Sequence, residues 1–402
     1  MKKQFVLLAL AISIFAVSCK KDNSAPSIQT IKIGGLFSIT GNWSSLGIPS
    51  QEAMKLGLID VNNYLEEKGS LIRLSTVVYD TELDTVLAKN AIVRAYTTND
   101  VKYIIGPQSS AEVGAILPYA NANNILVVSQ GSTASSLAIP NDAVFRFCPG
   151  DAVEGRAMAQ TMYAQGKQAI ITLSRDDAGN RGLQQSVGSS FTSLGGQVTA
   201  IAPYPTTGND YANLLSQLRT SIQQYTATYG ANQVGVYLAS FDECKDIFQS
   251  AISDPVFSSV NWYGGDGIVL SSVLLTSNAA CQFAATTHFF APNFGLPLTP
   301  NPDLAAIAST IRTNTGLEPD AYALSVYDAM WVIAKTLSSY SNVTTDFTKL
   351  KTDFTNEANQ HYGITGPVVL NANGDRDTGS FDYFGVVLEG GVYTWKLIGK
   401  SL

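Results

Sequence analysis

Histidine, cysteine and positive charge are scarce in this chain of 402 residues. Its two histidines, His288 and His361, do not stand in a motif with other metal ligands. The four cysteines include no C-x-x-C pair, so a structural zinc site is not expected. A G-x-S-x-G motif, which presents the nucleophile of many serine hydrolases, is also missing. We therefore predict no metal, no cofactor and no enzymatic activity.

The charge balance and the short apolar runs exclude two further classes of protein. The chain has 25 Lys and Arg residues against 32 Asp and Glu residues, a formal net charge of −7. Because it offers no basic field to neutralise phosphates, a nucleic-acid partner is not expected. After residue 18 no apolar run approaches the roughly 20 residues that span a bilayer. With 45% hydrophobic residues, the chain can bury one large core or two ordinary ones.

The first 19 residues, MKKQFVLLALAISIFAVSC, are typical of a secretory signal. Two lysines precede an apolar core, and small residues precede Cys19. The AVSC ending resembles a bacterial lipobox, in which the cysteine is acylated and becomes the first residue of the mature chain. We predict a signal peptide over residues 1–18, lipidation at Cys19 and a lipid-anchored polar tether over residues 19–29. An ordinary signal peptide with an incidental cysteine is the alternative.

Three cysteines follow this segment: Cys148, Cys244 and Cys281. Outside the cytoplasm, an odd number allows at most one disulfide and leaves one free thiol. Cys244 and Cys281 are the better pair only if their segments approach each other, which the sequence leaves open.

From residue 30, apolar β-like runs alternate with segments of helical spacing. This alternation predicts a parallel sheet covered by helices on both faces. The pattern restarts after FRFCPGDAVEG, residues 145–155, so we predict two α/β units of similar size. Near the C-terminus, Gly390 and Gly391 separate two apolar runs and predict an antiparallel hairpin.

Several local motifs predict where helices begin and end. Residues 40–50, TGNWSSLGIPS, indicate a loop before a helix over 50–65. Ser109 with Glu112 predicts a capping box for a helix over 110–123, which Pro118 should kink or shorten.

One apolar strand, ILVV at residues 125–128, ends in the run SQGSTASS instead of an ordinary polar turn. In doubly wound sheets, ligands bind at the carboxyl ends of the strands. Two such units facing each other would place this run in a cleft, where its amides and hydroxyls can cradle a ligand. A plain surface loop is the alternative, because Ser, Thr and Gly also cluster in turns.

In their order and spacing, these motifs resemble those of type I periplasmic solute-binding proteins of the branched-chain amino acid family. The resemblance covers residues 30 to about 400 and rests on these landmarks: IKIGGLFSITGNWSSLG, VVYDTELDTVLAKNAIVRAYTTNDVKYIIGPQSS, ILVVSQGSTASSL, FRFCPGD, GGDG and YALSVYDAMWVIAKTL. It implies two doubly wound α/β lobes joined by a three-strand hinge, with a ligand cleft between them. The lobes would be residues 30–148 with 291–365, and residues 149–290 with 366–402.

The resemblance also implies a binding site. Ser110 and Thr133 would hold a ligand carboxylate, while the Gly131 carbonyl and Asp266 would hold a ligand ammonium. A neutral cradle with one acid suits a zwitterion. The remaining predicted site residues are Ser132, Phe241, Trp43 and Ala178.

Some positions depart from the family pattern. The tyrosine that closes over the ligand falls on Ala178, and a loop aromatic falls on Leu46, with Trp43 close by. The family's first-lobe disulfide is absent, because its positions are Leu83 and Ser109 here. Losing the tyrosine implies a roomier or differently lidded pocket. Beside it, the RDD run at residues 175–177 would either add polar contacts or form a solvated loop.

These features predict an extracytoplasmic lipoprotein on a bacterial membrane. By lobe closure it would capture an amino acid, or a similar small zwitterion or carboxylate, for an ABC importer. A ligand-sensing subunit of a membrane receptor is the alternative, since the fold does not distinguish the two partners. A hydrolase is less well supported, because neither histidine stands in a motif that places a general base near a serine.

Overall fold

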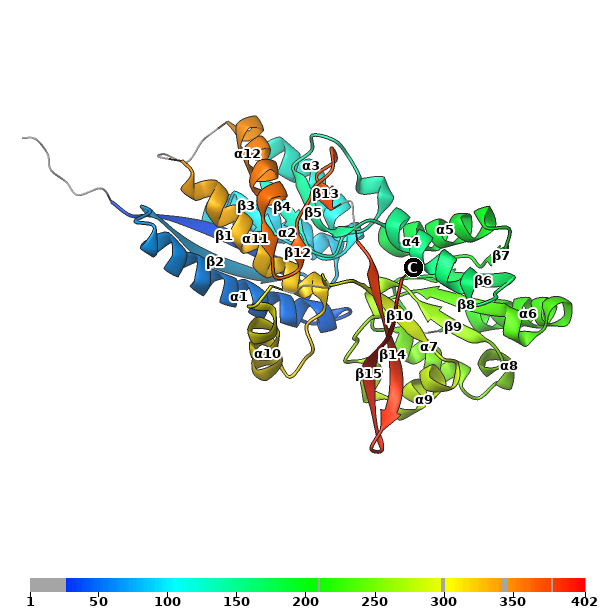
Figure 1. Ribbon diagram of the computed structural model, residues 1–402. Coiled ribbons are helices and arrows are strands. Elements are labelled where there is room, and N and C mark those ends of the chain that lie inside the picture. The colour runs from blue at the N-terminus through cyan, green and yellow to red at the C-terminus, as the bar shows by residue number, and fades with distance from the viewer. Residues whose placement is uncertain (1–26, 209, 298–300, 341–345, 377–378, 402) are drawn as a thin grey trace, which may run out of the picture.

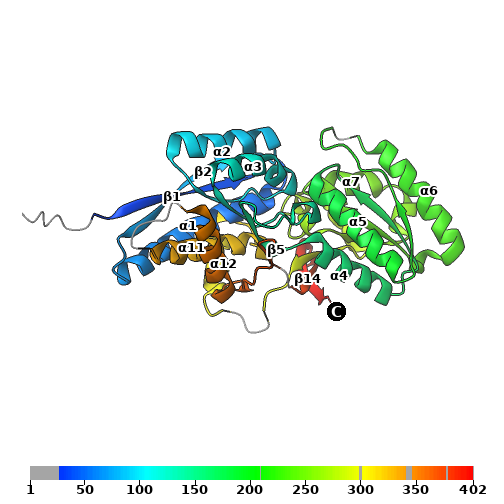
Figure 2. The same cartoon turned by 90° about the horizontal axis from the view of Figure 1, so that it is seen from above.

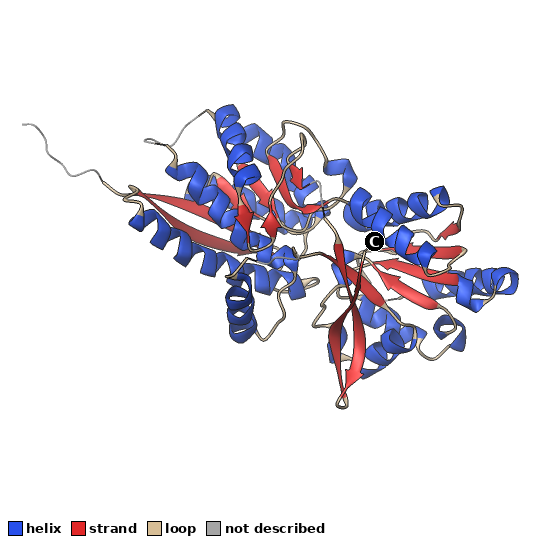
Figure 3. Cartoon of the chain, in the orientation of Figure 1, coloured by secondary structure: helices blue, strands red, loops and turns tan. Residues whose placement is uncertain are grey.

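Two large sheets, each with helices packed on both faces, form the two lobes of the molecule (Figures 1 and 3). The computed structural model describes residues 27–208, 210–297, 301–340, 346–376 and 379–401. The predicted signal peptide, Cys19 and most of the predicted tether lie outside the described residues.

The first sheet has the strand order β13-β5-β4-β3-β1-β2, and all its pairs are parallel. Its strands are β1 (Gln29–Phe37), β2 (Ile72–Asp80), β3 (Tyr103–Ile105), β4 (Leu126–Ser129), β5 (Val144–Pro149) and β13 (Asp375–Arg376). The helices of this lobe are α1 (Ser44–Glu67), α2 (Thr85–Asn99), α3 (Ser110–Asn123), α10 (Leu304–Thr315), α11 (Ala321–Ser338) and α12 (Phe347–Gln360). One apolar core joins α1, α11 and α12 to one face of the sheet, and another joins α2 and α3 to the other face.

The second sheet has the order β15-β14-β10-β9-β8-β6-β7 and is parallel except where β14 pairs with β10 and β15. Its strands are β6 (Ala169–Ser174), β7 (Gln197–Ala200), β8 (Val234–Ala239), β9 (Asn261–Gly264), β10 (Phe290–Phe294), β14 (Phe381–Glu389) and β15 (Val392–Lys400). The helices of this lobe are α4 (Asp151–Ala164), α5 (Ala178–Ser193), α6 (Ala212–Tyr229), α7 (Cys244–Ala251), α8 (Pro255–Ser258) and α9 (Asn278–Thr286). A small third sheet pairs β11 (Tyr362–Gly363) with β12 (Gly366–Pro367).

The chain passes from one sheet to the other after β5, after β10 and after β13, as the predicted three-crossover hinge requires. Figure 2 shows the two lobes side by side, with β5, α4 and β14 near their junction. Two of the expected lobe boundaries fall too early. Residues 290–294 complete the second sheet as β10, and Asp375 and Arg376 pair with β5 in the first. Backbone pairing, which the sequence does not show, decides these positions.

Helix α1 begins at Ser44, six residues before its predicted start, so the expected loop over residues 40–50 is partly helical. Trp43 is its N-cap and adopts a left-handed conformation with φ of 59°. Gly47 makes the early start possible, because a Cβ there would lie 1.8 Å from the Ser38 carbonyl oxygen. This packing holds Trp43 at the edge of the first lobe, facing the second.

Other local predictions are mostly confirmed. The Ser109–Glu112 capping box is present, and Glu389 pairs with Val392 across the two-glycine turn. Helix α3 nevertheless runs through Pro118 to Asn123, so the expected shortening is wrong. All three described cysteines are buried and free, so Cys244 and Cys281 do not form a disulfide.

Candidate functional site

The parallel strands of both sheets end at the junction of the lobes, and a cavity lies there. First-lobe residues of its lining follow β1, β3 and β4, and second-lobe residues follow β6, β8 and β9. The lining consists of Trp43, Ser109, Ser110, Gly131, Thr133, Gly179, Asn180, Leu183, Phe241 and Asp266. The cavity has a volume of only about 10 Å³, far below the ~300–1,000 Å³ usual for ligand pockets. The two lobes are therefore closed upon each other.

Six of the eight predicted site residues line this one cavity: Trp43, Ser110, Gly131, Thr133, Phe241 and Asp266. Ser132 lies just behind it, and its hydroxyl donates to the Ser110 oxygen at 3.1 Å. Ala178 is placed elsewhere, in a separate surface hollow with Ser135 and Arg181. The reason is helical geometry, because the next residues of α5, and not its first, turn toward the cleft.

Two helix N-termini, one from each lobe, meet at the cavity. Helix α3 begins at Ser110, and Gly179 is the second residue of α5. A Cβ on Gly179 would lie only 3.3 Å from the Ser110 hydroxyl, so the two ends are nearly in contact. The unpaired amides of a helix start, together with its dipole, favour a bound anion. This end of the cavity suits a carboxylate.

Asp266, which suits a cation instead of an anion, lies in the short helix Asp266–Ile268 that follows β9. The Tyr322 hydroxyl of α11 donates to its Oδ2 at 3.1 Å, and its own amide donates to Glu154 Oε1 at 3.2 Å. Burial disfavours its charged form and raises the pKa of Asp266 to about 6. A cation at this carboxylate would relieve that penalty.

Three further buried acids lie near Asp266 that were not predicted from the sequence. Asp151 and Glu154 lie on α4, and Asp320 caps α11. Burial raises the pKa of both Asp151 and Asp320 to about 7, and raises the pKa of Glu154 well above its ordinary value. Among the described residues, none of these four acids has a Lys, Arg or His within ion-pair distance. Asp151 and Glu154 follow β5, and Asp266 follows β9, so their place at the ligand-binding edge of the sheets was the available signal; Asp320 at the start of α11 gave no such signal.

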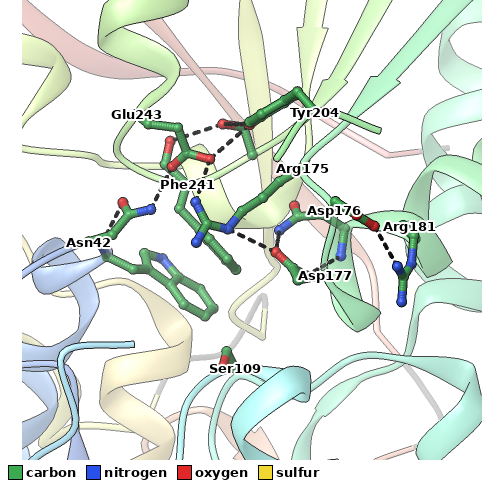
Figure 4. A network of polar contacts seen from close by, with 12 residues as sticks. Asn42, Ser109, Arg175, Asp176, Asp177, Arg181, Tyr204, Phe241 and Glu243 are labelled. Atoms are coloured by element: carbon green, nitrogen blue, oxygen red, sulfur yellow. Dashed lines mark hydrogen bonds and ion pairs between the residues drawn. The ribbon is translucent and has the colours of Figure 1, made fainter. Parts of the chain in front are cut away.

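Direct contacts across the cleft hold the lobes together near Trp43. The rings of Trp43 and Phe241 stack with centroids 4.3 Å apart. Beside them, Asn42 Nδ2 donates to Glu243 Oε2 at 2.7 Å (Figure 4). Ser45 donates to an Asp242 oxygen at 2.9 Å. The aromatic pair closes one side of the cavity.

The RDD run at residues 175–177 is a bound network and not a solvated loop, apart from Asp176. Arg175 pairs with Asp177 at 3.1 Å and with Glu243 at 3.2 Å, as Figure 4 shows. Its guanidinium also lies 5.7 Å from the centre of the Phe241 ring. Tyr204 donates to Glu243 as well, at 2.8 Å. This network fixes Phe241 and Glu243, the second-lobe partners of the contacts across the cleft.

The described residues contain no group of three or more His, Cys, Asp or Glu side chains placed to hold a metal ion. Within the same residues, no helix has both the length and the apolarity needed to span a bilayer.

Comparison with solved structures identifies the architecture. The leucine-binding protein LivK of Thermotoga maritima is 21% identical with a TM-score of 0.74, covering 92% of this chain and 98% of that protein. The LivJ substrate-binding protein of Streptococcus pneumoniae, solved with isoleucine, is 16% identical with a TM-score of 0.73, covering 92% and 99%. A Rhodopseudomonas palustris solute-binding protein solved with benzoate is 16% identical with a TM-score of 0.71, covering 92% of this chain and 96% of that protein.

Comparison of sequences adds a relative and a family. An uncharacterised protein of Methanocaldococcus jannaschii is 27% identical over 96% of this chain and 94% of its own length. The sequence model of the family described as "Receptor family ligand binding region" matches residues 49–389. The chain thus belongs to the receptor-family ligand-binding region family and has the type I periplasmic binding fold.

Proposed function

We propose that this protein is an extracytoplasmic solute-binding lipoprotein that captures an amino acid, or a similar small zwitterion, between its lobes for an ABC importer. One observation carries the proposal: two helix N-termini and a buried, unpaired aspartate line the same cavity. These are the complementary charges of a zwitterion's carboxylate and ammonium. The solved neighbours include proteins described as binding leucine or isoleucine.

The two ends of the cavity orient the ligand. Its carboxylate would accept hydrogen bonds from the hydroxyls of Ser110 and Thr133 and from the α3 and α5 amides. Its ammonium would donate to Asp266 and to the Gly131 carbonyl. The ligand side chain would then face Trp43 and Phe241, because these rings close the remaining side.

Lobe separation is required for entry, since the closed cavity is too small to admit a ligand without movement. The three crossovers provide the hinge, and the ligand would be held by groups from both lobes. A ligand that bridges the lobes favours the closed state by its differential affinity for that state. The protein would act by closing its lobes on the ligand, without catalysing a reaction.

The closed conformation would also suit a sensor subunit of a membrane receptor. The description of the family as a receptor ligand-binding region supports this second candidate function. Lipidation at Cys19 would attach either form to the membrane. Metabolic labelling of the full chain with a palmitate analogue tests the anchor. Label should be present in the natural sequence and absent from Cys19→Ser.

A thermal-shift panel tests the ligand class. The mature chain would be screened against the common amino acids, each beside its deaminated carboxylic acid and its decarboxylated amine. Ligands that bind the native state raise the melting temperature. We expect only compounds with both charged groups to give a large rise. A rise with the carboxylic acids alone would contradict the role given to Asp266.

A further inference from the structure

Behind Asp266 lies a second acid that does not reach the cavity. Glu154 is on α4, and its side chain is 1% exposed. Its Oε1 accepts the Asp266 amide hydrogen at 3.2 Å, and the Asp266 charge repels that of Glu154. Its Oε2 is buried without a hydrogen-bond partner among the described residues. A buried, half-satisfied carboxyl therefore backs the acid that faces the ligand.

The charged groups that act on Glu154 are acids, while a base, Arg146 of β5, acts on the neighbouring Asp151 and Cys148. Asp266 and Asp151 raise its pKa by charge repulsion, added to the larger effect of burial. The phenols that face it are Tyr237 of β8, Tyr322 of α11 and Tyr383 of β14. Asp320 adds negative charge near Asp266, and the buried Cys148 thiol lies close by with a raised pKa. Two adjacent carboxyls in such a site cannot both ionise at little cost, so the ligand-free pair retains a proton.

We propose that Glu154 is a positioning residue which exchanges this proton for the ligand's ammonium group. In the ligand-free cleft the Glu154 carboxyl keeps its proton and supports the ionised Asp266. When an ammonium binds Asp266, Glu154 ionises and its proton passes to the solvent, leaving two carboxylates around one cation. The inference rests on the proposed capture of an amine-bearing ligand.

The linkage has a definite sign. Because the nearby cation lowers the pKa of Glu154 in the complex, binding releases protons, and affinity for an amine ligand rises with pH. The rise approaches tenfold per pH unit where release is complete. A carboxylic acid that lacks the amine brings no cation to Asp266, so it should release no proton from this pair.

Isothermal titration calorimetry in phosphate and in Tris at equal pH measures the number of protons released. The probe is the amino acid that gives the largest thermal shift, and its deaminated analogue is the matched ligand control. Glu154→Gln keeps an acceptor for the Asp266 amide but cannot release a proton. We expect it to lower the proton release per amine bound and to flatten the rise of affinity above pH 7. Its affinity at pH 8 should fall roughly tenfold.

Asp142→Asn is the matched control variant. Burial raises the pKa of Asp142 to about 6, yet Asp142 lies outside the cleft, beside Lys351. It should leave the proton release unchanged. The inference is overturned if Glu154→Gln releases as many protons per amine bound as the natural chain. It is also overturned if the natural chain binds an amine without releasing protons. If only carboxylic acids bind, the proposed ligand class fails first and the inference falls with it.

Discussion

Replacing Asp266 by Asn should separate the stability of the protein from its binding function. The natural carboxyl is buried, and its pKa is raised from the ordinary 3.8 to about 6. At pH 7 it is ionised in both states, and that shift corresponds to about 3 kcal/mol of destabilisation of the folded chain. Asn is uncharged, nearly isosteric and still able to accept the Tyr322 hydroxyl hydrogen bond. We therefore expect Asp266→Asn to be more stable at pH 7 by up to about 3 kcal/mol.

The pH dependence follows from the direction of the shift. A folded acid with a raised pKa binds protons more tightly than the unfolded chain, so stability falls as pH rises from about 4 to about 6. The advantage of Asp266→Asn should therefore vanish below pH 4 and be complete above pH 6 to 7. Urea titrations of the ligand-free chain at pH 4 and pH 7 measure it. The exposed Glu67→Gln on α1 is the charge-matched control, expected within about 0.5 kcal/mol of the natural chain.

Binding should change in the opposite sense. Removing one partner of a buried charge pair costs about 2–5 kcal/mol, which raises the Kd for an amine ligand by roughly 30-fold to a few thousand-fold. Isothermal titration with the amino acid selected by the thermal-shift panel gives this value. A variant that is less stable at pH 7, or that keeps the natural affinity, would refute the reasoning from burial.

Three further changes test other parts of the cleft. Thr133→Val should weaken carboxylate ligands by about 1–2 kcal/mol and leave the fold intact, and equal affinity in calorimetry would remove Thr133 from the site. Asn42→Ala deletes the 2.7 Å hydrogen bond to Glu243 across the cleft, so X-ray scattering should show a larger radius of gyration for the ligand-free protein. An unchanged radius would show that this hydrogen bond does not hold the lobes together. Ala178→Tyr lies outside the cavity and should not alter ligand selectivity, whereas a shift toward smaller ligands would restore the predicted lid at that position.

Most of the fold was predictable because alternation of strand and helix is a local property of the sequence. The capping box at Ser109 and the hairpin at Gly390 and Gly391 were read from single motifs, and both are present. The early start of α1 was missed, because it depends on the contact of Gly47 with the distant Ser38. The strand assignments of residues 290–294 and 375–376 were missed for the same reason, since hydrogen bonds to distant strands define them.

The convergence of Ser110, Thr133 and Asp266 on one cavity was predictable, because each of them follows the end of a strand, while their role in binding stays a prediction. The site prediction failed at Ala178, where one step along a helix turns a side chain from the cleft to the surface. The buried acids Asp151 and Glu154 were also missed. Their importance comes from burial without an ion-pair partner among the described residues, a property of three-dimensional packing that spacing along the chain does not reveal.

A crystal structure of the mature chain with its best amino acid ligand tests the central claim most directly. We predict electron density for the ligand between the lobes, with its carboxylate within hydrogen-bond distance of Ser110 and Thr133 and its ammonium at Asp266. Density for the ligand in a hollow of one lobe alone, or with its amine directed away from Asp266, would contradict the account.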